Sequence, residues 1–473
     1  MKLTFKYGRG HIMLEIIKRL EYYAKVQPQS IALQIDDEIV NYESLYQKIC
    51  DCTLNSPKFK LGSRVALLSD SPIVNITNYF VILMMDGVPC FLDNKWSRDT
   101  IDKLIENYHI EYITTAVGKF KRTTSFGTYD KYISEQLKVD DLLHIGYTSG
   151  TTGLPKAYYR NEHSWIASYV ENEKLIYNYE KALAAPGPLA HSLSLYTCIF
   201  ALYSGRTFIG QRQFDAKRFI SILNEQHSNI ALFLVPTMLH QLLNVDTTIT
   251  HIKSIFCSGA KLSESLFKTV SQQFKNVNII EFFGTSEASF ITYNFNQTSP
   301  TNSVGQVFPN VSIKLEAQDN RKIGLLKVQS NMIYSGYVDV EVVQPHSWIE
   351  TGDYAYIQNN QLYLVSRKSD RLIIGGKNIY PNVIEQQVKS LDGIKEAVVV
   401  GEPHRRFGEI AVLIYVGNQE LDYTTLRRYL RQTLSRYEIP SKLVRVKDLP
   451  FTNSGKVARN TVQTLYLEGA FKV

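Results

Sequence analysis

The sequence has no apolar run that is long enough to cross a membrane. Its most apolar stretches, such as Tyr79–Leu92, contain polar or helix-breaking residues and fall short of the ~20 apolar residues that a spanning helix needs. The basic opening segment, Met1–Met13, lacks the apolar stretch of a signal peptide, and Met13 is an alternative start. We therefore expect a cytoplasmic protein that is neither secreted nor membrane-spanning.

Cysteine is too scarce and too irregularly spaced for a disulfide framework or a zinc site. Reduced thiols in a cytosol fit this pattern best. The sequence also lacks internal repeats, low-complexity segments and an appended carrier domain. The chain has five cysteines, an odd number without metal-type spacing: Cys50, Cys52, Cys90, Cys198 and Cys257.

The size and charge of the chain set broad limits. Its 473 residues exceed the usual size of one domain, so we expect two or three hydrophobic cores. Hydrophobic residues make up 44% and charged residues 21%, which is ordinary for a globular protein. The net charge of +7 comes from lysines and arginines that are spread throughout. It gives no argument for nucleic acid and is compatible with anionic substrates such as nucleotides.

Predicted strands and helices alternate in the first hundred residues. Apolar residues at helical spacing predict helices over Met13–Lys25 and Asn75–Met85. Strands are expected over Ile31–Ile35, Arg64–Leu68 and Val88–Leu92. This alternation is typical of a parallel sheet with right-handed crossovers, and we therefore expect an α/β fold.

The most distinctive stretch, residues 147–156, reads Tyr-Thr-Ser-Gly-Thr-Thr-Gly-Leu-Pro-Lys and follows a predicted buried strand at Leu142–Ile145. Small hydroxyl side chains and bare backbone N–H groups suit a loop that wraps a polyphosphate, and Lys156 adds a compact positive charge. The loop is not a Walker loop, because Gly150 and Gly153 are too close together. By composition alone, a polar surface loop is the more frequent explanation.

The order of these residues, however, resembles the signature of the adenylate-forming superfamily, which contains acyl-CoA synthetases, peptide-synthetase adenylation domains and firefly luciferase. The resemblance is strong from Tyr147 onward and loose before it, and it is closest to bacterial acyl-CoA synthetases that act as fatty-acid–CoA ligases. It implies a large N-terminal adenylate-forming domain of layered β-sheets and helices, residues 1–367, and a small mobile C-terminal α/β domain, residues 368–473. The hinge is expected at Lys368, Ser369 and Asp370.

Two further segments resemble nucleotide-binding motifs of the family. The stretch Glu281–Glu287 (Glu-Phe-Phe-Gly-Thr-Ser-Glu) resembles its aromatic-Gly-x-Thr/Ser-Glu motif. Phe283 would offer a face to adenine, Thr285 a hydroxyl to the α-phosphate, and Glu287 an oxygen ligand to Mg2+. Ser258–Ser263 resembles the segment that lies along the adenine ring, and its last residue is expected to cap the helix that follows.

The resemblance gives both ends of the chain a share of the site. An Asp on a tight turn commonly bonds only its own backbone, but Asp353 would accept both ribose hydroxyls, and Arg367 would contact ribose and phosphate. A lone lysine on a C-terminal loop is usually just solvated, but Lys456 would bridge the carboxylate and the α-phosphate. The ATP- and AMP-binding residues that the resemblance implies are Thr148, Ser149, Gly150, Thr151, Thr152, Gly153, Lys156, Gly259, Ala260, Lys261, Phe282, Phe283, Gly284, Thr285, Asp353, Arg367 and Lys456.

His191 is the candidate that would lie beside the acid. In isolation, a histidine at this place is more often a helix cap or a core residue. The family has a His or an aromatic residue there, beside the acyl pocket and the reacting carboxylate. We therefore expect catalytic roles for His191, Thr148, Glu287 and Lys456, with Mg2+ held by Glu287 and Thr148.

The acid itself is expected to be apolar. The expected pocket segments are Leu193–Phe200, Leu232–Leu243 and the neighbourhood of Phe283, and they show no obvious Arg or Lys that could meet a second carboxylate. We also find no Asp near His191 or Pro236 that could meet an ammonium group. A fatty or aryl acid is therefore expected rather than a dicarboxylate or an amino acid.

The turn at residues 375–379, Gly-Gly-Lys-Asn-Ile, indicates the acceptor. It resembles acyl-CoA synthetases rather than peptide-synthetase adenylation domains, and Gly375, Gly376 and Lys377 would bind CoA. Downstream, an amphipathic helix is expected over Tyr423–Tyr437. We thus expect an acyl-CoA synthetase that uses ATP, Mg2+ and CoA. The alternatives are an enzyme that loads a carrier-protein thiol, a non-catalytic nucleotide sensor of the same fold, and an unrelated α/β binding protein.

Overall fold

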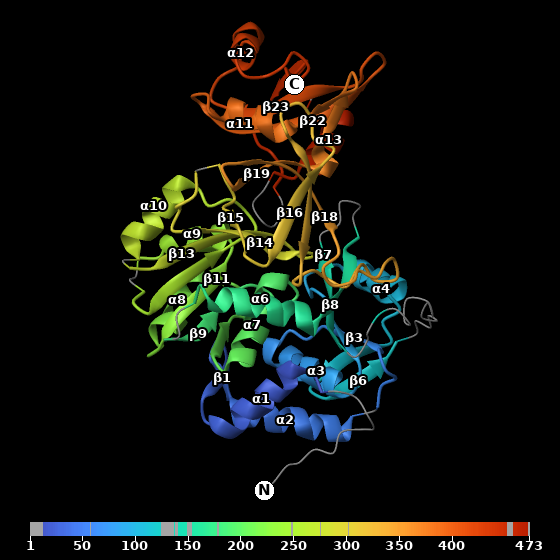
Figure 1. Ribbon diagram of the computed structural model, residues 1–473, viewed down its shortest axis with the longest axis vertical. Coiled ribbons are helices and arrows are strands. Elements are labelled where there is room, and N and C mark those ends of the chain that lie inside the picture. Colours follow the sequence, from blue (N-terminus) through green and yellow to red (C-terminus); the bar gives the residue numbers. More distant parts are fainter. Residues whose placement is uncertain are drawn as a thin grey trace. The chain divides into compact units, whose positions relative to one another are not determined.

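The chain folds into two compact units (Figure 1). One unit comprises Met1–Ser312 and Val328–Ile349, and the other Ile313–Lys327 and Glu350–Val473. The residues that this computed structural model describes are 13–56, 58–123, 137, 141–148, 154–176, 179–246, 249–274, 276–300, 302–451 and 457–471.

The sequence predicts a domain division directly after Arg367. The boundaries between the two compact units all lie earlier in the chain. The strands that precede Arg367 join the C-terminal part through a small core cluster of Ile323, Tyr354, Val365 and Tyr380. Packing therefore assigns these strands to the second unit. The predicted division after Arg367 concerns where the C-terminal domain rotates, and it stays a prediction.

A nine-stranded sheet forms the centre of the first unit, in the order β15-β14-β13-β12-β11-β9-β10-β1-β2. The six central strands, β13, β12, β11, β9, β10 and β1, are parallel. Strands β14 and β15 at one edge and β2 at the other pair antiparallel. The predicted strand over Ile31–Ile35 is confirmed. The strands are β1 (Ile31–Ile35), β2 (Glu38–Asn41), β9 (Glu180–Ala184), β10 (Thr207–Gly210), β11 (Asn229–Leu234), β12 (Ile252–Cys257), β13 (Asn278–Thr285), β14 (Ser289–Phe295) and β15 (Gln306–Val307).

A six-stranded sheet in the same unit contains the strands on either side of the Gly-rich stretch, in the order β6-β5-β3-β4-β7-β8. Its four inner strands are parallel and its two edge strands antiparallel. The expected α/β fold is thus confirmed. The strands are β3 (Arg64–Leu67), β4 (Val88–Phe91), β5 (Tyr112–Ala116), β6 (Lys119–Arg122), β7 (Leu142–Thr148) and β8 (Lys156–Asn161).

Helices connect these strands and cover the sheets with their apolar faces. The helix expected from Asn75 begins at Pro72, because proline suits the first turn and the Ser71 hydroxyl accepts a hydrogen bond from Val74 N. Ser263 caps α10 as predicted, accepting from Leu266 N at 3.2 Å. The helices are α1 (Glu15–Val26), α2 (Tyr42–Asn55), α3 (Pro72–Met84), α4 (Arg98–Asn107), α6 (Glu162–Glu173), α7 (Ser192–Ser204), α8 (Ala216–Asn224), α9 (Pro236–Leu243) and α10 (Glu264–Gln273).

Two smaller sheets lie mostly in the second unit, although the first residues of β16 and the last of β17 belong to the first unit. Strands β16 to β19 form a four-stranded sheet, and β20 to β24 a five-stranded sheet with β23 at its centre. Helices α11 and α12 pack on one core of the five-stranded sheet. The elements are β16 (Val311–Glu316), β17 (Gly324–Ser330), β18 (Ile349–Gln358), β19 (Gln361–Arg367), β20 (Leu372–Ile374), β21 (Lys377–Ile379), α11 (Pro381–Lys389), β22 (Ile394–His404), β23 (Gly408–Gly417), α12 (Tyr423–Leu430), β24 (Lys442–Arg445) and α13 (Arg459–Leu467).

Candidate active site

The Gly-rich stretch joins a hairpin of strands β7 and β8. The strands pair antiparallel, with Thr148 opposite Lys156. The buried strand predicted at Leu142–Ile145 is confirmed as the first part of β7. The hairpin therefore holds Thr148 and Lys156 side by side at the base of the loop. The loop residues Ser149, Gly150, Thr151, Thr152 and Gly153 lie outside the described residues.

A second hairpin, β13–β14, presents the predicted magnesium ligand. The turn is so tight that a Cβ atom on Gly284 would lie 1.9 Å from Ser289 O, so only glycine fits. Thr285 Oγ1 accepts a hydrogen bond from Ala288 N at 3.0 Å. Because a hydroxyl also carries one donor hydrogen, Thr285 can still donate to a phosphate oxygen. Glu287 lies half-buried in the same turn.

Tyr337, which the sequence analysis missed, connects the two hairpins. Its hydroxyl donates to Glu287 Oε1 at 2.6 Å, and its ring centroid lies 5.8 Å from Lys156 Nζ. Burial and the negative charge of Glu287 raise the pKa of Tyr337, so the phenol stays neutral and remains a donor. The backbones of Tyr337 and Tyr158, a residue of β8, form an isolated antiparallel β-bridge. The structure thus brings Lys156 and Glu287 to one place, with Tyr337 between them.

A buried positive charge lies behind the Glu287 turn. The Arg160 guanidinium donates to Ser286 O, to Met332 O at 2.9 Å and to Ser164 Oγ at 3.2 Å. In the part of the chain that the structure describes, no carboxylate forms an ion pair with it. Burial lowers the pKa of Arg160, and the charge of Glu287 is among the influences that oppose this shift. An arginine nevertheless stays protonated in proteins, so Arg160 adds positive potential where an anionic substrate would react.

The two aromatic residues of the predicted motif lie on opposite sides of β13, because side chains alternate along a strand. Phe282 is buried and packs on Phe290, with 4.6 Å between ring centroids. Phe283 is only half-buried. Phe283 is therefore the more accessible of the two, and its contact with adenine stays a prediction, whereas Phe282 belongs to the core.

The loop expected along the adenine ring is held by an ion pair. Lys261 Nζ donates to Glu281 Oε2 at 3.2 Å and to Ser303 O at 2.5 Å. Gly259 in this loop has φ +87°, which favours glycine. Since Glu281 already neutralises Lys261, this lysine has a structural role, and its contact with a nucleotide stays a prediction, as does that of Ala260.

His191 lies at the N-cap of α7 with an exposed side chain. Its Nε2 is 3.4 Å from Oδ2 of the buried Asp93, which follows β4. The pKa of Asp93 is lowered, mainly by its hydrogen bond with His191 and against a smaller effect of burial. The expectation that no Asp lies near His191 is therefore wrong, because the two residues are far apart in the sequence. Since Asp93 is paired with the imidazole, it offers no uncommitted carboxylate to an ammonium group.

In the second unit, Asp353 and Arg367 face each other on neighbouring strands β18 and β19. Arg367 Nε lies 3.0 Å from Asp353 Oδ1, and its Nη1 donates to Thr351 O at 3.3 Å. Gly352 between the threonine and the aspartate has φ +76°. The structure thus joins the two residues that were predicted separately for ribose binding.

The predicted hinge residues Lys368, Ser369 and Asp370 form a short 3-10 helix directly after β19. Asp370 Oδ2 lies 3.3 Å from Arg459 Nε, and Lys368 pairs with Glu350 at 2.7 Å. All of these contacts lie inside the second compact unit. A hinge role for these residues therefore stays a prediction.

The paired glycines connect β20 to β21. Gly375 and Gly376 have φ values of +56° and +74°, and two positive values in a two-residue hairpin are typical of a type I′ turn. Local geometry alone therefore accounts for both glycines. Their contact with CoA, and that of Lys377, stays a prediction. Lys456 lies outside the described residues.

Glu287 is the carboxylate that was predicted to bind Mg2+, and this role stays a prediction. Among the described residues, no group of three or more His, Cys, Asp or Glu side chains could hold a metal ion. Mg2+ binds through one or two carboxylates together with phosphate oxygens, and Glu287 has one oxygen engaged by Tyr337.

Within the described ranges, no helix has the length and hydrophobicity that a membrane span requires.

The chain is similar to known acyl-CoA ligases in both sequence and fold. The chain is 96% identical over 461 residues to "Putative long chain fatty acid-CoA ligase VraA" of Staphylococcus haemolyticus, covering 98% of this chain and all of the relative. Its fold matches ATP-bound MatB of Rhodopseudomonas palustris with a TM-score of 0.77 at 20% identity, over 96% of this chain and 99% of the other. It also matches MenE, the o-succinylbenzoate coenzyme A synthetase of Bacillus subtilis in complex with ATP and magnesium, with a TM-score of 0.74 at 21% identity, over 93% and 98% of the two chains.

Two family models cover most of the chain. Residues 20–338 match the model for AMP-binding enzymes, and residues 383–456 match that for the AMP-binding enzyme C-terminal domain. The first match alone spans more than half of the 473 residues. The chain therefore belongs to the AMP-binding enzyme family.

Proposed function

We propose that the chain is an AMP-forming ligase that joins a long-chain fatty acid to CoA. One observation carries this proposal: the hydrogen bond of Tyr337 holds Glu287 in the same place as Lys156. That place combines a carboxylate for Mg2+ with a lysine for phosphate oxygens. The name of the 96% identical relative supports the fatty acid as substrate.

In the first half-reaction, a carboxylate oxygen of the acid attacks the α-phosphorus of ATP. The bond from the α-phosphorus to the oxygen that bridges it to the β-phosphate breaks. Acyl-AMP forms, and pyrophosphate leaves with the bridging oxygen. Because two anions meet, positioning and positive charge must supply most of the catalysis. Lys456 neutralises the attacking carboxylate and the α-phosphate, and Lys156 holds the outgoing pyrophosphate. The Thr285 hydroxyl donates to an α-phosphate oxygen.

Glu287 fits as the protein ligand of Mg2+, with Thr148 as the second candidate. When bound, the ion would neutralise phosphate charge. Tyr337 fixes the Glu287 carboxylate by occupying one of its two oxygens. The buried Arg160 adds a fixed positive charge behind the turn, through its contact with Ser286 O.

In the second half-reaction, the CoA sulfur attacks the carbonyl carbon of the acyl-AMP. A thioester forms, and AMP leaves with the oxygen that came from the carboxylate. The C-terminal domain turns about residues 368–370, withdraws Lys456 and presents the Gly375–Gly376 turn to the pantetheine arm. Hinges in domain motions are typically a few loop or element-terminal residues, as here.

Transfer of the acyl group to a carrier-protein thiol is the second candidate function. The experiment therefore varies both the acid and the thiol acceptor. Pyrophosphate release from MgATP would be measured with fatty, aryl and amino acids, each without acceptor, with CoA and with a phosphopantetheinylated carrier. Glu287→Gln serves as the inactive control. Release that needs a fatty acid and ends in acyl-CoA supports the proposal. Acyl-carrier as the sole thioester, or no release with any acid, contradicts it.

A further inference from the structure

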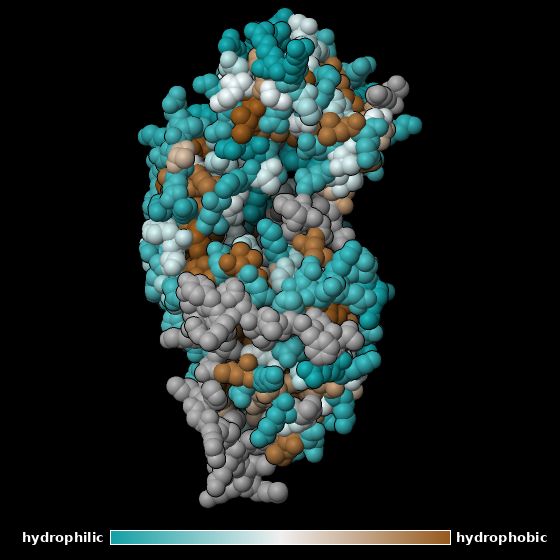
Figure 2. Space-filling view, turned by 90° about the vertical axis from the view of Figure 1, so that its right-hand side faces the viewer, coloured by the Kyte–Doolittle hydropathy of each residue, from teal (hydrophilic) through white to brown (hydrophobic). Residues whose placement is uncertain are grey.

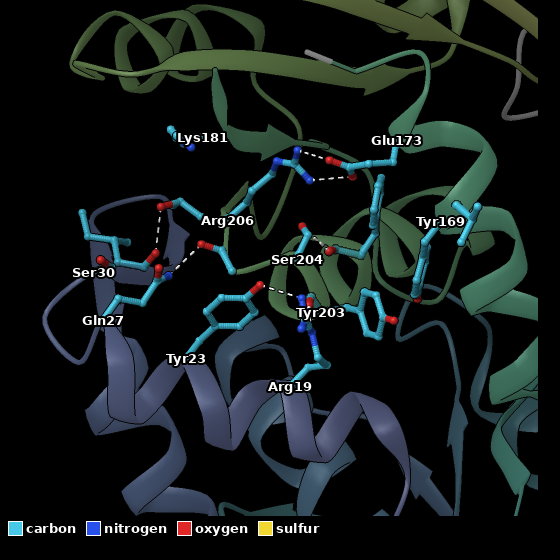
Figure 3. Close-up of a pocket in the computed structure, with 15 residues that line it drawn as sticks. Arg19, Tyr23, Gln27, Ser30, Tyr169, Glu173, Lys181, Tyr203, Ser204 and Arg206 are labelled. Atoms are coloured by element: carbon cyan, nitrogen blue, oxygen red, sulfur yellow. Dashed lines mark hydrogen bonds and ion pairs between the residues drawn. The ribbon is translucent and has the colours of Figure 1, made fainter. Parts of the chain in front are cut away.

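A cavity of about 780 Å³ lies in the first unit. Among its described lining residues is Phe200, the last residue of one expected acyl-pocket segment, but none of the residues predicted to bind ATP, Mg2+ or CoA. Helix α1, helix α6, the C-terminal end of α7 and the start of β10 surround it (Figure 3). Its volume is within the range of small-molecule sites. The large exposed hydrophobic residues are scattered over different elements, and on the face in Figure 2 they form small separate groups. The cavity is therefore the stronger candidate for a further site.

Arg19 is the most prominent charge in this cavity. Its Nε donates to Tyr203 O at 3.1 Å, and its Nη2 donates to Tyr23 Oη at 2.7 Å. The guanidinium lies 5.1 Å from the ring centroid of Tyr23 and 5.3 Å from that of Tyr203. Among the described residues, no carboxylate forms an ion pair with Arg19. A fixed guanidinium without a carboxylate partner is suited to bidentate binding of an anion.

The other charges of the cavity leave it positive. Arg206 is neutralised by Glu173, with Nη1 at 2.8 Å from Oε2 and Nη2 at 2.5 Å from Oε1. Lys181 is exposed and lines the same cavity. Three cations therefore face one carboxylate, and the excess positive charge comes from Arg19 and Lys181.

The walls combine aromatic rings with hydrogen-bonding groups. Tyr169 and Phe200 stack with 4.8 Å between their centroids and an interplanar angle of 5°. Tyr169 is 2% exposed, and its hydroxyl has no hydrogen-bond partner in the part of the chain that the structure describes. Gln27 and Ser30 add polar groups to the lining. The Gln27 side chain donates to Gly205 O at 2.7 Å. Aromatic rings with polar groups beside them suit a planar ligand with polar edges.

We propose that this cavity is a second binding site, for a nucleoside phosphate. Arg19 would pair with the phosphate, Lys181 would add positive potential, and the base would pack against the tyrosine rings. The polar lining residues Gln27 and Ser30 would bond to the edges of the base or to the sugar. The site is independent of the active site that the proposed function assigns.

The test is photo-crosslinking of the full chain with 8-azido-AMP, followed by peptide mapping. We expect label on the peptides that carry Tyr23 or Tyr203. Arg19→Gln should lower this label at least about tenfold, because it removes a charge-assisted contact, and Lys181→Gln should lower it severalfold. Lys18→Gln is the matched control, because Lys18 lies on the same helix, pairs with Glu15 and does not line the cavity. Its label should not change.

The outcomes separate this site from the active site. Label on the peptide that carries Phe283 reports on the proposed function, and it can appear or fail independently of label in the cavity. Absence of label from the Tyr23 and Tyr203 peptides overturns the inference. Unchanged label in both Arg19→Gln and Lys181→Gln, or displacement of the label by oleate but not by AMP, also overturns it. Since Lys181 is exposed, its variant keeps the test valid if Arg19→Gln fails to fold.

Discussion

Tyr337 donates a hydrogen bond of 2.6 Å to Glu287, a residue 50 positions earlier in the chain. Tyr337→Phe should raise the Mg2+ concentration needed for half-maximal adenylation about tenfold, because a hydrogen bond to a charged group contributes on the order of 1.5 kcal/mol. The measurement is pyrophosphate release as a function of Mg2+. Tyr334→Phe is the matched control, since Tyr334 bonds to Glu341 instead. An equal shift in both variants would show that Tyr337 does not orient the metal ligand.

Lys456 should separate the two half-reactions. Lys456→Ala is expected to slow adenylation by at least about a hundredfold, the loss typical of a removed transition-state donor. Thioester formation from supplied acyl-adenylate should remain largely intact, because this step does not use the lysine. Lys447→Ala, an exposed lysine of the same tail, should leave both steps unchanged. Equal loss of both steps in Lys456→Ala would count against the assignment.

Arg64 anchors the segment that carries Tyr337. It is 2% exposed and forms two hydrogen bonds of 2.7 Å with Asp339, two residues beyond Tyr337. Arg64→Ala should lower the free energy of unfolding of the first unit by about 3–5 kcal/mol, because it leaves a half-buried carboxylate without its partner. Thermal denaturation of the full chain would measure the effect. Arg98→Ala, which removes an exposed ion pair with Asp102, should cost less than about 1 kcal/mol, and a similar loss in both variants would refute the argument.

Asp93 should make its pair with His191 sensitive to acid. Because the folded pKa of Asp93 lies below the ordinary value of 3.8, the pair stabilises the fold above that value and loses its effect as the pH falls through the folded pKa. Asp93→Asn should therefore lower stability by on the order of 1 kcal/mol at pH 5 to 7, and the difference should vanish in stronger acid. Unfolding curves of both proteins, measured from pH 7 down into stronger acid, would check this pH dependence. A difference that persists at the lowest pH would contradict the sign.

Gly284 tests the geometry of the β13–β14 hairpin. A Cβ atom at this position would lie 1.9 Å from the backbone oxygen of Ser289, so Gly284→Ala must move one strand away from the other. We expect a loss of more than about 3 kcal/mol in the free energy of unfolding and loss of adenylation. Gly376→Ala serves as the comparison variant. A Cβ atom at this position would have nothing within 4 Å, so only the positive φ opposes alanine. If Gly284→Ala folds and reacts normally, the turn is not as tight as described.

The sequence predicted the parts of the fold that depend on local pattern. The strand at Ile31–Ile35 and the cap at Ser263 follow from neighbouring residues, and both are confirmed. The helix expected over Tyr423–Tyr437 ends at Leu430, because the apolar residues that follow, such as Leu434, join the core from turns. Helical spacing alone does not reveal where such a helix stops.

Contacts between distant segments could not be predicted from one sequence. Tyr337 and Arg160 have no motif of their own, and they became candidates only when folding placed them beside the Glu287 turn. Asp93 shows the same limit, since it approaches His191 only in the folded chain. The motif predicted Gly284 as a site residue, but its need for glycine comes from the partner strand.

In the proposed mechanism, the acid is activated by attack on the α-phosphorus of ATP before it reaches CoA. A fatty acid labelled with oxygen-18 in its carboxylate tests this directly, by mass spectrometry of the AMP formed in the presence of MgATP and CoA. Each AMP should then carry one heavy oxygen atom, acyl-CoA should form in equal amount, and pyrophosphate should stay unlabelled. Unlabelled AMP, or label in phosphate or pyrophosphate, would contradict it.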